Sequence, residues 1–456
     1  MFKKLTRKFH YISNLKKDIT EYIFNTAKQT RCDIENILNR NIKITPTNAS
    51  YHQNINIQAY IAKVSRGGHK RRKNDKIRVV FLFQEPSYWP SIKTLYENLK
   101  NDKRFEVFVV AIPITYPPDL NKLELRDSVI NFLKENNIDY INGITVGDNA
   151  FDIYTLKPDY VFVQIHFDIQ RQLEYKTNIL RLYTKVCLVP HAFLLSASDN
   201  KELIYQSDYF RIFVPNEFHA KTLAGVLHHD DNIEVTGYPR FDLYQDEIKD
   251  SNLWKISKQH NPNIKRIIWS PHWWAYGHSQ KLADGVLGLY NYFYKMVKNN
   301  PDIELVIKPH PNLFNGLVAS GYITNEQKEK LFNDIKSLPN AQIYTGGNYI
   351  DLFKTADLIV NNSISFLIEW LPSKKPMIFF DTERKFELNE IAEQIMNVYY
   401  HADTIDKLNK TINSLLNSDD TMKKQRLDLI DKLELNQYGA AEKIKESLIK
   451  NVDTEY

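Results

Sequence analysis

Short apolar runs separated by amphipathic stretches begin at Ile77 and dominate the middle of the chain. An apolar run of four to eight residues predicts a buried strand, and apolar residues spaced by three and four predict a helix. In the first half, the predicted strands are Ile77–Phe83, Phe105–Ile112, Tyr160–Ile165, Lys185–Val189, Phe210–Val214 and Ile233–Val235. The helices between them are predicted at Ser91–Leu99, Leu123–Glu135, Ile169–Tyr183 and Glu217–Leu227.

Polar residues around Gln245–Lys265 interrupt this alternation, which then restarts. The second set of predicted strands is Arg266–Trp269, Ile303–Ile307, Ala341–Tyr344, Leu358–Val360 and Met377–Phe380. Its helices are predicted at Gln280–Lys298, Thr324–Ser337, Tyr349–Thr355 and Ser363–Leu371, and the charged tail from Thr404 is also helical.

Strands that alternate with helices of this length predict parallel sheets covered on both faces. We therefore expect two doubly wound, Rossmann-like domains at 76–247 and 248–403, with C-terminal helices at 404–456. A ligand crevice is expected at the carboxyl ends of the strands, between the two domains.

The N-terminal extension, residues 1–75, has helical patterning, and its first residues are basic. Six lysines and arginines precede the first acidic residue, Asp18, and Phe2, Leu5, Phe9 and Ile12 recur at helical spacing. Such a helix either lies on an anionic membrane surface or docks on the protein with a solvated basic face. No apolar stretch approaches the ~20 residues of a spanning helix. We expect a cytoplasmic protein, peripheral on the inner face of the membrane.

Composition excludes several classes of protein. The net charge is +5, with 60 basic and 55 acidic residues interspersed, which argues against a nucleic-acid binder. The two cysteines suggest neither a disulfide framework nor a metal site. No G-x-G-x-x-G, Walker loop or C-x-x-C pair occurs, and no D-x-D follows a strand. We expect no cofactor and no bound metal, and we assign none to the polar loop His228-His229-Asp230-Asp231.

Histidine follows proline at the end of three predicted strands. The most distinctive segment is Lys308-Pro309-His310-Pro311, and the other two are Pro271-His272 and Pro190-His191. Because proline restricts its own φ and the residue before it, these strand ends are stiff. A stiff strand end that presents ammonium and imidazole suits recognition of phosphate oxygens. Trp273 and Trp274, which follow His272, could stack on a base but are more typical of a core.

A further candidate anion site follows the strand that ends at Val360. Asn or Ser in Asn361-Asn362-Ser363-Ile364-Ser365 is expected to cap a new helix, whose free N–H groups and Ser365 hydroxyl would bind an anion. Glu369, one turn along, could accept hydrogen bonds from ribose or glycerol hydroxyls. Gly346-Gly347 adds a turn on the same rim. In the first domain, Arg240 of Gly237-Tyr238-Pro239-Arg240-Phe241-Asp242 is a candidate for anion binding.

Together these segments resemble the CDP-glycerol glycerophosphotransferase family, whose members prime and polymerise teichoic acids and related capsule polymers. The resemblance spans roughly residues 77 to 381 and rests on His191, Gly237–Asp242, Ser270–Trp274, His310-Pro311, Asn361–Ser365, Glu369 and Lys375-Pro376. Trp274 stands where the family usually has Arg, and Asn-Asn-Ser-Ile-Ser replaces T-D-Y-S-S. The resemblance implies a GT-B fold. It also implies His191 and His310 as the essential histidines, with Ser365 and Glu369 in the donor site.

The function that follows is transfer of glycerol phosphate, or a related alditol phosphate, from a CDP-activated donor to a hydroxyl of a surface polymer or its lipid-linked primer. His191 is then the general base. The donor side comprises His310, Lys308, His272, Asn362, Ser363, Ser365, Glu369 and Gly346. Two alternatives stay open: a nucleotide-sugar-dependent glycosyltransferase on the same scaffold, and a non-catalytic nucleotide-binding component of a surface-polymer complex.

Overall fold

The computed structural model describes residues 75–115, 122–145, 149–193, 195, 209–227, 230–248, 253–256, 258, 261–272, 280–310, 312–346, 349–381 and 387–454. The predicted N-terminal helix lies outside the described residues. So do several residues singled out above, namely Trp273, Trp274, Pro311, Gly347, His228 and His229.

The first sheet has seven parallel strands in the order β3-β2-β1-β4-β5-β6-β7. They are β1 (Ile77–Phe83), β2 (Phe105–Ala111), β3 (Ile141–Asn142), β4 (Tyr160–Val163), β5 (Lys185–Leu188), β6 (Arg211–Val214) and β7 (Ile233–Val235). Six of them were predicted from their apolar runs. The strand β3 was missed because two residues carry no pattern.

The second sheet repeats the arrangement with six parallel strands in the order β10-β9-β8-β11-β12-β13. They are β8 (Lys265–Ser270), β9 (Ile303–Ile307), β10 (Ala341–Ile343), β11 (Leu358–Asn361), β12 (Met377–Phe380) and β13 (Tyr400–Ala402). The prediction of two doubly wound parallel sheets is therefore confirmed. In each sheet, the strand order reverses beside its first strand, at β1/β4 and at β8/β11, where such folds bind ligands.

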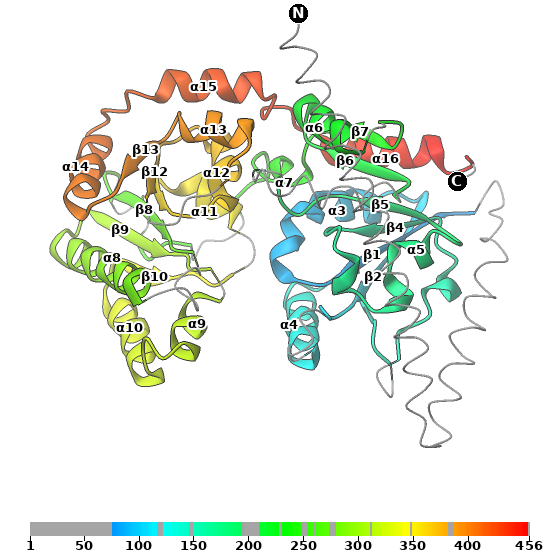
Figure 1. Ribbon diagram of the computed structural model, residues 1–456, viewed down its shortest axis with the longest axis horizontal. Helices are drawn as coiled ribbons and strands as arrows, with labels where there is room; N and C mark the ends of the chain where they lie inside the picture. The colour runs from blue at the N-terminus through cyan, green and yellow to red at the C-terminus, as the bar shows by residue number, and fades with distance from the viewer. Residues whose placement is uncertain are drawn as a thin grey trace, which may run out of the picture. The chain divides into compact units, whose positions relative to one another are not determined.

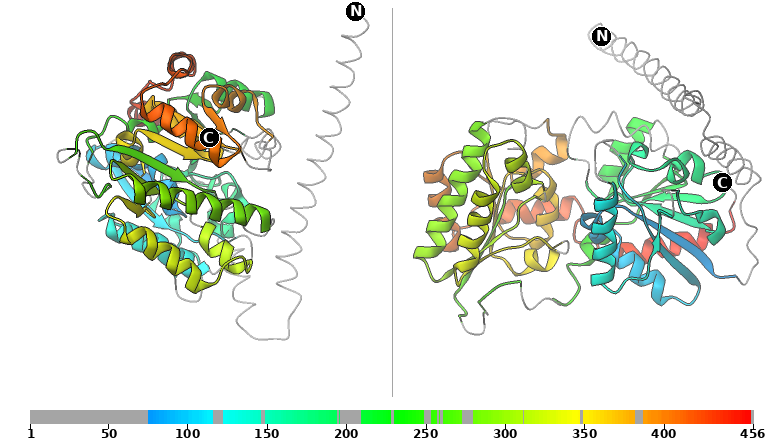
Figure 2. Two further views of the ribbon diagram at one scale, coloured as in Figure 1. Left: turned by 90° about the vertical axis from the view of Figure 1, so that its left-hand side faces the viewer. Right: turned by 90° about the horizontal axis from the view of Figure 1, so that it is seen from below.

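Alternate residues of the second sheet enter two separate hydrophobic cores. Helices cover both faces of this sheet (Figures 1 and 2). Ile267 and Trp269 of β8 face one core, and Ile268 between them faces the other, as the two-residue period of a strand requires. The first core includes α8 (Gln280–Asn299), α9 (Leu313–Ala319), α10 (Asn325–Ser337) and α14 (Ile405–Leu416). The second includes α11 (Ile350–Thr355), α12 (Ser365–Trp370), α13 (Glu390–Met396) and α15 (Lys423–Lys432).

One face of the first sheet packs on α3 (Lys93–Asn101), α4 (Lys122–Glu135) and α16 (Ala440–Asn451). Figure 1 shows α16, in red, beside this sheet although it comes from the end of the sequence. Ile444 and Leu448 of α16 join the core of β1, and the hydroxyl of Tyr160 donates to the Leu448 carbonyl at 2.8 Å. The first domain is thus built from two distant parts of the chain.

The segment 169–183 is not the single helix that its pattern predicts. It forms two short 3₁₀ turns, Asp168–Gln170 and Leu173–Tyr175, followed by α5 (Thr177–Leu180). The Asp168 carboxylate accepts hydrogen bonds from the backbone N–H of Thr177, at 3.0 Å, and from the side chain of buried Arg171. These contacts fold the segment back on itself, and tertiary bonding therefore overrides helical periodicity here. The remaining helix of the first sheet, α6 (Glu217–Leu227), has the predicted bounds.

No helix of the described ranges is long and apolar enough to cross a lipid bilayer.

Candidate functional site at the strand ends

The three segments that follow β8, β9 and β11 converge at one edge of the second sheet. The strand β8 lies between the other two, so the residues after these strands leave the sheet side by side. The backbone N–H of His310 donates to the Pro271 carbonyl at 2.9 Å, and that of His272 donates to the Asn362 side-chain oxygen at 2.8 Å. The rings of His272 and His310 lie 4.9 Å apart. The structure therefore brings together His272, His310 and Asn362 at the β8/β11 reversal.

Lys308 places a buried cation at the same edge. Its side-chain nitrogen lies 4.9 Å from the ring centre of Tyr349 and 5.6 Å from that of Phe366. No carboxylate of the described residues lies within ion-pair distance of it. Burial lowers the pKa of Lys308 to about 8, against the opposing effect of Glu369. A buried ammonium with aromatic neighbours and no paired carboxylate is suited to an anionic ligand.

The loop after β11 is tied together by its own side chains. Asn361 donates to the Ser363 carbonyl at 2.6 Å, and the Ser363 hydroxyl accepts from the backbone N–H of Ser365 at 3.1 Å. Ile364, and not Asn or Ser, occupies the N-cap position of α12, but the Ser363 hydroxyl still accepts from the first N–H group of this helix, that of Ser365. Asn362 and Ser363 are buried, whereas Ser365 is exposed at the start of this short helix. Ser365 is thus the hydroxyl of this loop that a ligand can reach.

Glu369 and Arg240 bond to each other. The guanidinium of Arg240 pairs with the carboxylate of Glu369, and the Tyr349 hydroxyl donates to the other carboxylate oxygen. Arg240 also donates to the His191 carbonyl at 2.9 Å. Both charged side chains are 3% exposed. Burial by itself would lower the pKa of Arg240, but the Glu369 carboxylate outweighs it, so the pKa is raised. In this structure Glu369 faces Arg240 and Tyr349.

Gly346 lies at an exposed position beyond β10, next to the end of β9. A Cβ at this position would lie 2.7 Å from the end of the Tyr344 side chain, which would have to shift to admit a larger residue. The structure gives no contact between Gly346 and the histidines of this edge.

His191 follows β5 in the first domain, and its tautomer is set by one hydrogen bond. Its Nδ1 lies 3.0 Å from the carbonyl oxygen of Gln164. Since a carbonyl only accepts, Nδ1 carries the proton and Nε2 carries a lone pair. Burial lowers the pKa of His191 to about 4, so the ring is neutral at neutral pH. The ring also contacts that of Tyr88, with 4.2 Å between centres and an angle of 37° between the ring planes.

His310 has the opposite tautomer. The backbone N–H of Asn312 donates to Nδ1 of His310 at 3.2 Å, which places the ring proton on Nε2. Burial and the charge of Lys308 lower the pKa of His310 to about 4, so this ring is neutral as well. One histidine can therefore accept a proton at Nε2, whereas the other can donate a hydrogen bond from Nε2.

Three structural roles in these segments were not found from the sequence. Lys375 donates to the Lys354 carbonyl at 2.7 Å and so caps the C-terminal end of α11. Asp242, in the short helix α7 (Pro239–Asp242), accepts from the backbone N–H groups of Gly439, Ala440 and Ala441. Tyr349 bridges Arg240 and Glu369. These partners are distant in sequence, and no local pattern signals them.

In the described ranges, no three His, Cys, Asp or Glu side chains are grouped so as to hold a metal ion.

Comparison with known proteins gives one family and one fold. The family model described as CDP-Glycerol:Poly(glycerophosphate) glycerophosphotransferase matches residues 190–443. This range contains the strand-end histidines 191, 272 and 310 and the whole second sheet. No curated protein matches the chain.

Solved structures with the same fold are distant in sequence. A histidine variant of the wall teichoic acid polymerase TagF, soaked with CDPG, is 14% identical with a TM-score of 0.55, covering 91% of this chain and 98% of its own. S. aureus MnaA with UDP is 14% identical, with a TM-score of 0.55 and coverage of 83% and 98%. Neisseria meningitidis UDP-GlcNAc 2-epimerase with UDP-GlcNAc is 15% identical, with a TM-score of 0.54 and coverage of 82% and 100%. These similarities confirm the predicted GT-B-like fold.

Proposed function

The chain belongs to the CDP-glycerol:poly(glycerophosphate) glycerophosphotransferase family, and from this premise we propose that it moves glycerol phosphate from CDP-glycerol to an acceptor hydroxyl and releases CMP. The acceptor is a surface polymer or its lipid-linked primer. The observation that carries the proposal is that Lys308, which is buried and has no carboxylate partner among the described residues, lies at the same strand end as neutral His310. The ammonium of Lys308 and the imidazole N–H of His310 both suit binding to the oxygens of a diphosphate.

In the proposed reaction, the acceptor oxygen attacks the phosphorus that bears glycerol. A new P–O bond forms to the acceptor, and the bond between this phosphorus and the bridging oxygen breaks. CMP leaves with the bridging oxygen and its electron pair. The hydroxyl proton passes to His191, whose Nε2 lone pair is available in the tautomer that Gln164 fixes.

On the donor side, the charge that builds on the leaving CMP is offset by fixed groups. Lys308 supplies the ammonium, and His310 supplies an Nε2–H donor. The exposed hydroxyl of Ser365 adds a further donor, and Asn362 holds the His272 backbone beside them. Positioning and charge stabilisation of this kind carry most of the catalysis in phosphoryl transfer. No step of this proposal requires a bound metal.

Product analysis tests the proposal. Purified protein with CDP-glycerol and a soluble glycerol phosphate oligomer should release CMP in step with lengthening of the oligomer. Release of a nucleoside diphosphate from a nucleotide sugar would instead identify a glycosyltransferase. Binding of CDP-glycerol without turnover with any acceptor would identify a non-catalytic protein. CDP-ribitol belongs in the same panel, because the roles proposed for these groups concern the diphosphate and do not distinguish one alditol from another.

We also infer that the basic residues of 1–17 bring the enzyme to an anionic membrane surface, where a lipid-anchored acceptor lies. Each basic residue near such a surface contributes about 1 kcal/mol, and salt weakens the attraction. Deleting residues 1–17 should reduce sedimentation with anionic vesicles and slow transfer to a lipid-linked acceptor, but not to a short soluble one. Equal vesicle binding by the full and truncated chains would refute the inference.

A further inference from the structure

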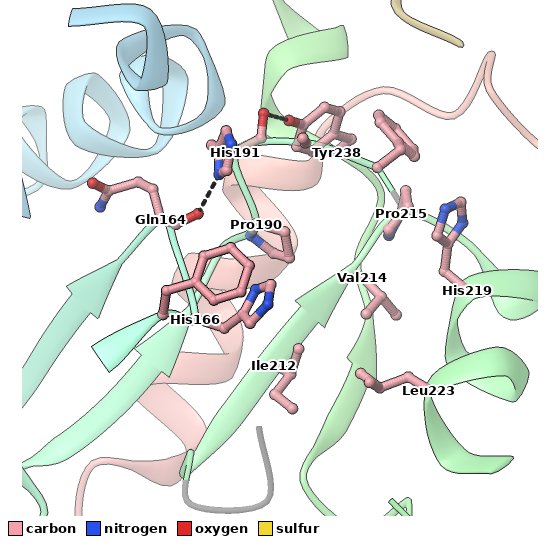
Figure 3. Close-up of a pocket in the computed structure, with 13 residues that line it drawn as sticks. Gln164, His166, Pro190, His191, Ile212, Val214, Pro215, His219, Leu223 and Tyr238 are labelled. Atoms are coloured by element: carbon pink, nitrogen blue, oxygen red, sulfur yellow. Dashed lines mark hydrogen bonds between the residues drawn. The ribbon is translucent and has the colours of Figure 1, made fainter. Parts of the chain in front are cut away.

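A pocket of about 180 Å³ lies in the first domain at the carboxyl edge of the sheet, where β4, β5 and β6 end. Apolar side chains, among them Phe193, Ile212, Val214 and Leu223, form most of its wall. In Figure 3, His166 and His219 lie on either side of Ile212 and Val214. Its described lining residues include no lysine, arginine, aspartate or glutamate.

His219 contributes a buried hydrogen-bond acceptor to this pocket. The side-chain oxygen of Asn216 faces His219, because the Asn216 amide donates to the Leu433 carbonyl at 2.9 Å. Nδ1 of His219 lies 2.8 Å from this oxygen and must donate to it, which leaves a lone pair on Nε2. The residue is 3% exposed, and its Nε2 has no hydrogen-bond partner among the residues that the structure describes. Burial lowers the pKa of His219 to about 3, so the ring is neutral.

His166 presents a second such atom. Its Nε2 is also buried and, within the described part of the chain, has no hydrogen-bond partner. Burial and the nearby charge of Arg171 lower the pKa of His166 to about 4. Each buried polar atom without a partner costs about 1–3 kcal/mol. A ligand hydroxyl, which both donates and accepts, would satisfy either nitrogen and recover that free energy.

We propose that this pocket binds an uncharged, hydroxyl-bearing unit of the acceptor, with its hydroxyls bonded to Nε2 of His219 and of His166. The inference rests on the proposed function, because the proposed base His191 lines the same pocket. The CH groups of a sugar ring or a short polyol would pack on Phe193 and Leu223. A phosphate is disfavoured, since the described lining residues offer it no cation and burying an unpaired charge is costly.

The size of the pocket limits the ligand to one unit. Pockets for drug-sized ligands measure about 300–1,000 Å³, which is well above the volume found here. The hydroxyl that attacks therefore belongs to a terminal unit whose uncharged part lies in the pocket. Any phosphate of the acceptor lies outside it. The recognised end of the acceptor is thus a polyhydroxylated group and not a phosphodiester.

Ligand-observed saturation-transfer NMR on the full chain tests this proposal without donor or turnover. The probes are a methyl hexopyranoside, glycerol, glycerol phosphate and CMP, each alone. We expect saturation of at least one of the first two, and this signal should depend on His219. Glycerol phosphate and CMP can bind at the donor side, so any signal from them should not depend on His219. A stronger response from the glycoside than from glycerol identifies the bound unit as a sugar. The opposite result identifies it as a polyol. Absence of any response from both neutral probes, or a response from glycerol phosphate or CMP that is lost in His219→Phe, overturns the proposal.

Variants connect the signal to the pocket. His219→Phe removes the acceptor atom and should weaken probe binding about tenfold, as loss of one hydrogen bond predicts. His219→Gln keeps an acceptor oxygen near the position of Nε2 and should retain most of the binding. Ala192→Phe, at a half-buried position, fills the pocket and should also weaken probe binding. It tests the site if His219→Phe does not fold. Unchanged binding in both His219→Phe and Ala192→Phe refutes the site.

The outcome is separable from that of the proposed function. Probe binding that depends on His219, in a protein that never releases CMP, would sink the transferase proposal and leave the pocket intact. CMP release without probe binding would refute the pocket and leave the transferase proposal intact. Where transfer is measured, His219→Phe should raise KM for the acceptor about tenfold and more than it raises KM for CDP-glycerol.

Discussion

Arg240 and Glu369 form a buried ion pair between residues 129 positions apart in the sequence. Arg240 comes from the segment that follows the first sheet, and Glu369 from α12 of the second domain. The same guanidinium donates to the backbone carbonyl of His191. Arg240 therefore connects the loop that carries His191, the proposed base, to α12, the helix that follows the donor-side loop.

Replacing either member of this pair should destabilise the protein. Arg240→Leu or Glu369→Leu leaves the other charge buried and unpaired, which costs about 3–5 kcal/mol. The double variant should be more stable than either single one, since no charge then remains unpaired. Denaturant unfolding of the four proteins of this cycle measures the effect. Single variants within 1 kcal/mol of the parent would show that the pair is not buried in solution.

His310→Ala should lower the turnover number by about 10²-fold or more, because it removes an Nε2–H donor from the developing charge. His401→Ala is the matched control. His401 is a histidine of the same domain on β13, where it pairs with Asp381, and its loss should not slow transfer. Steady-state CMP release measures both. Similar rates for the two variants would remove His310 from the donor site.

The pH profile of kcat/KM should be broad. His191 acts only when deprotonated, so activity falls as the pH drops through its lowered pKa of about 4. Lys308 acts only when protonated, so activity falls as the pH rises through about 8. The alkaline limb should be absent in Lys308→Arg, which stays charged. An acidic limb near the ordinary histidine value of about 6.5 would contradict the neutral, buried state of His191.

Asp242→Ala should loosen the C-terminal helix from the first domain. The Asp242 carboxylate accepts from three backbone N–H groups at the start of α16, at 2.7, 3.1 and 2.9 Å. Loss of such a cap costs about 0.5–2 kcal/mol. Faster proteolysis near residue 439 and a lower Tm are the expected readouts. Asp428→Ala, at an exposed position of α15, is the control and should change neither.

The strands were predictable because each buried parallel strand is a continuous apolar run, and most predicted bounds agree with the structure to within two residues. The strand β13 was missed because Tyr400-His401-Ala402 is short and not continuously apolar. The convergence of His272, His310 and Asn362 was predictable because each of these polar side chains follows a strand. The carboxyl ends of parallel strands share one edge of the sheet.

What the sequence did not predict depends on contacts between distant residues. The tautomer of His191 is set by the carbonyl of Gln164, and the partner of Glu369 is an arginine from another domain. The lone pair of His219 depends on Asn216, which is itself oriented by the Leu433 carbonyl. Each of these requires three-dimensional coordinates, because neither periodicity nor spacing records which backbone oxygen faces a side chain.

The return of α16 to the first sheet has a consequence for synthesis of the protein. Val79 and Phe81 of β1 share their core with Ile444 and Leu448, which the ribosome adds more than 360 residues later. The second domain is complete before that helix emerges, so it can fold as a unit while the first remains open along one face. During translation, the exposed apolar face of the first sheet is the part of the chain most in need of a chaperone.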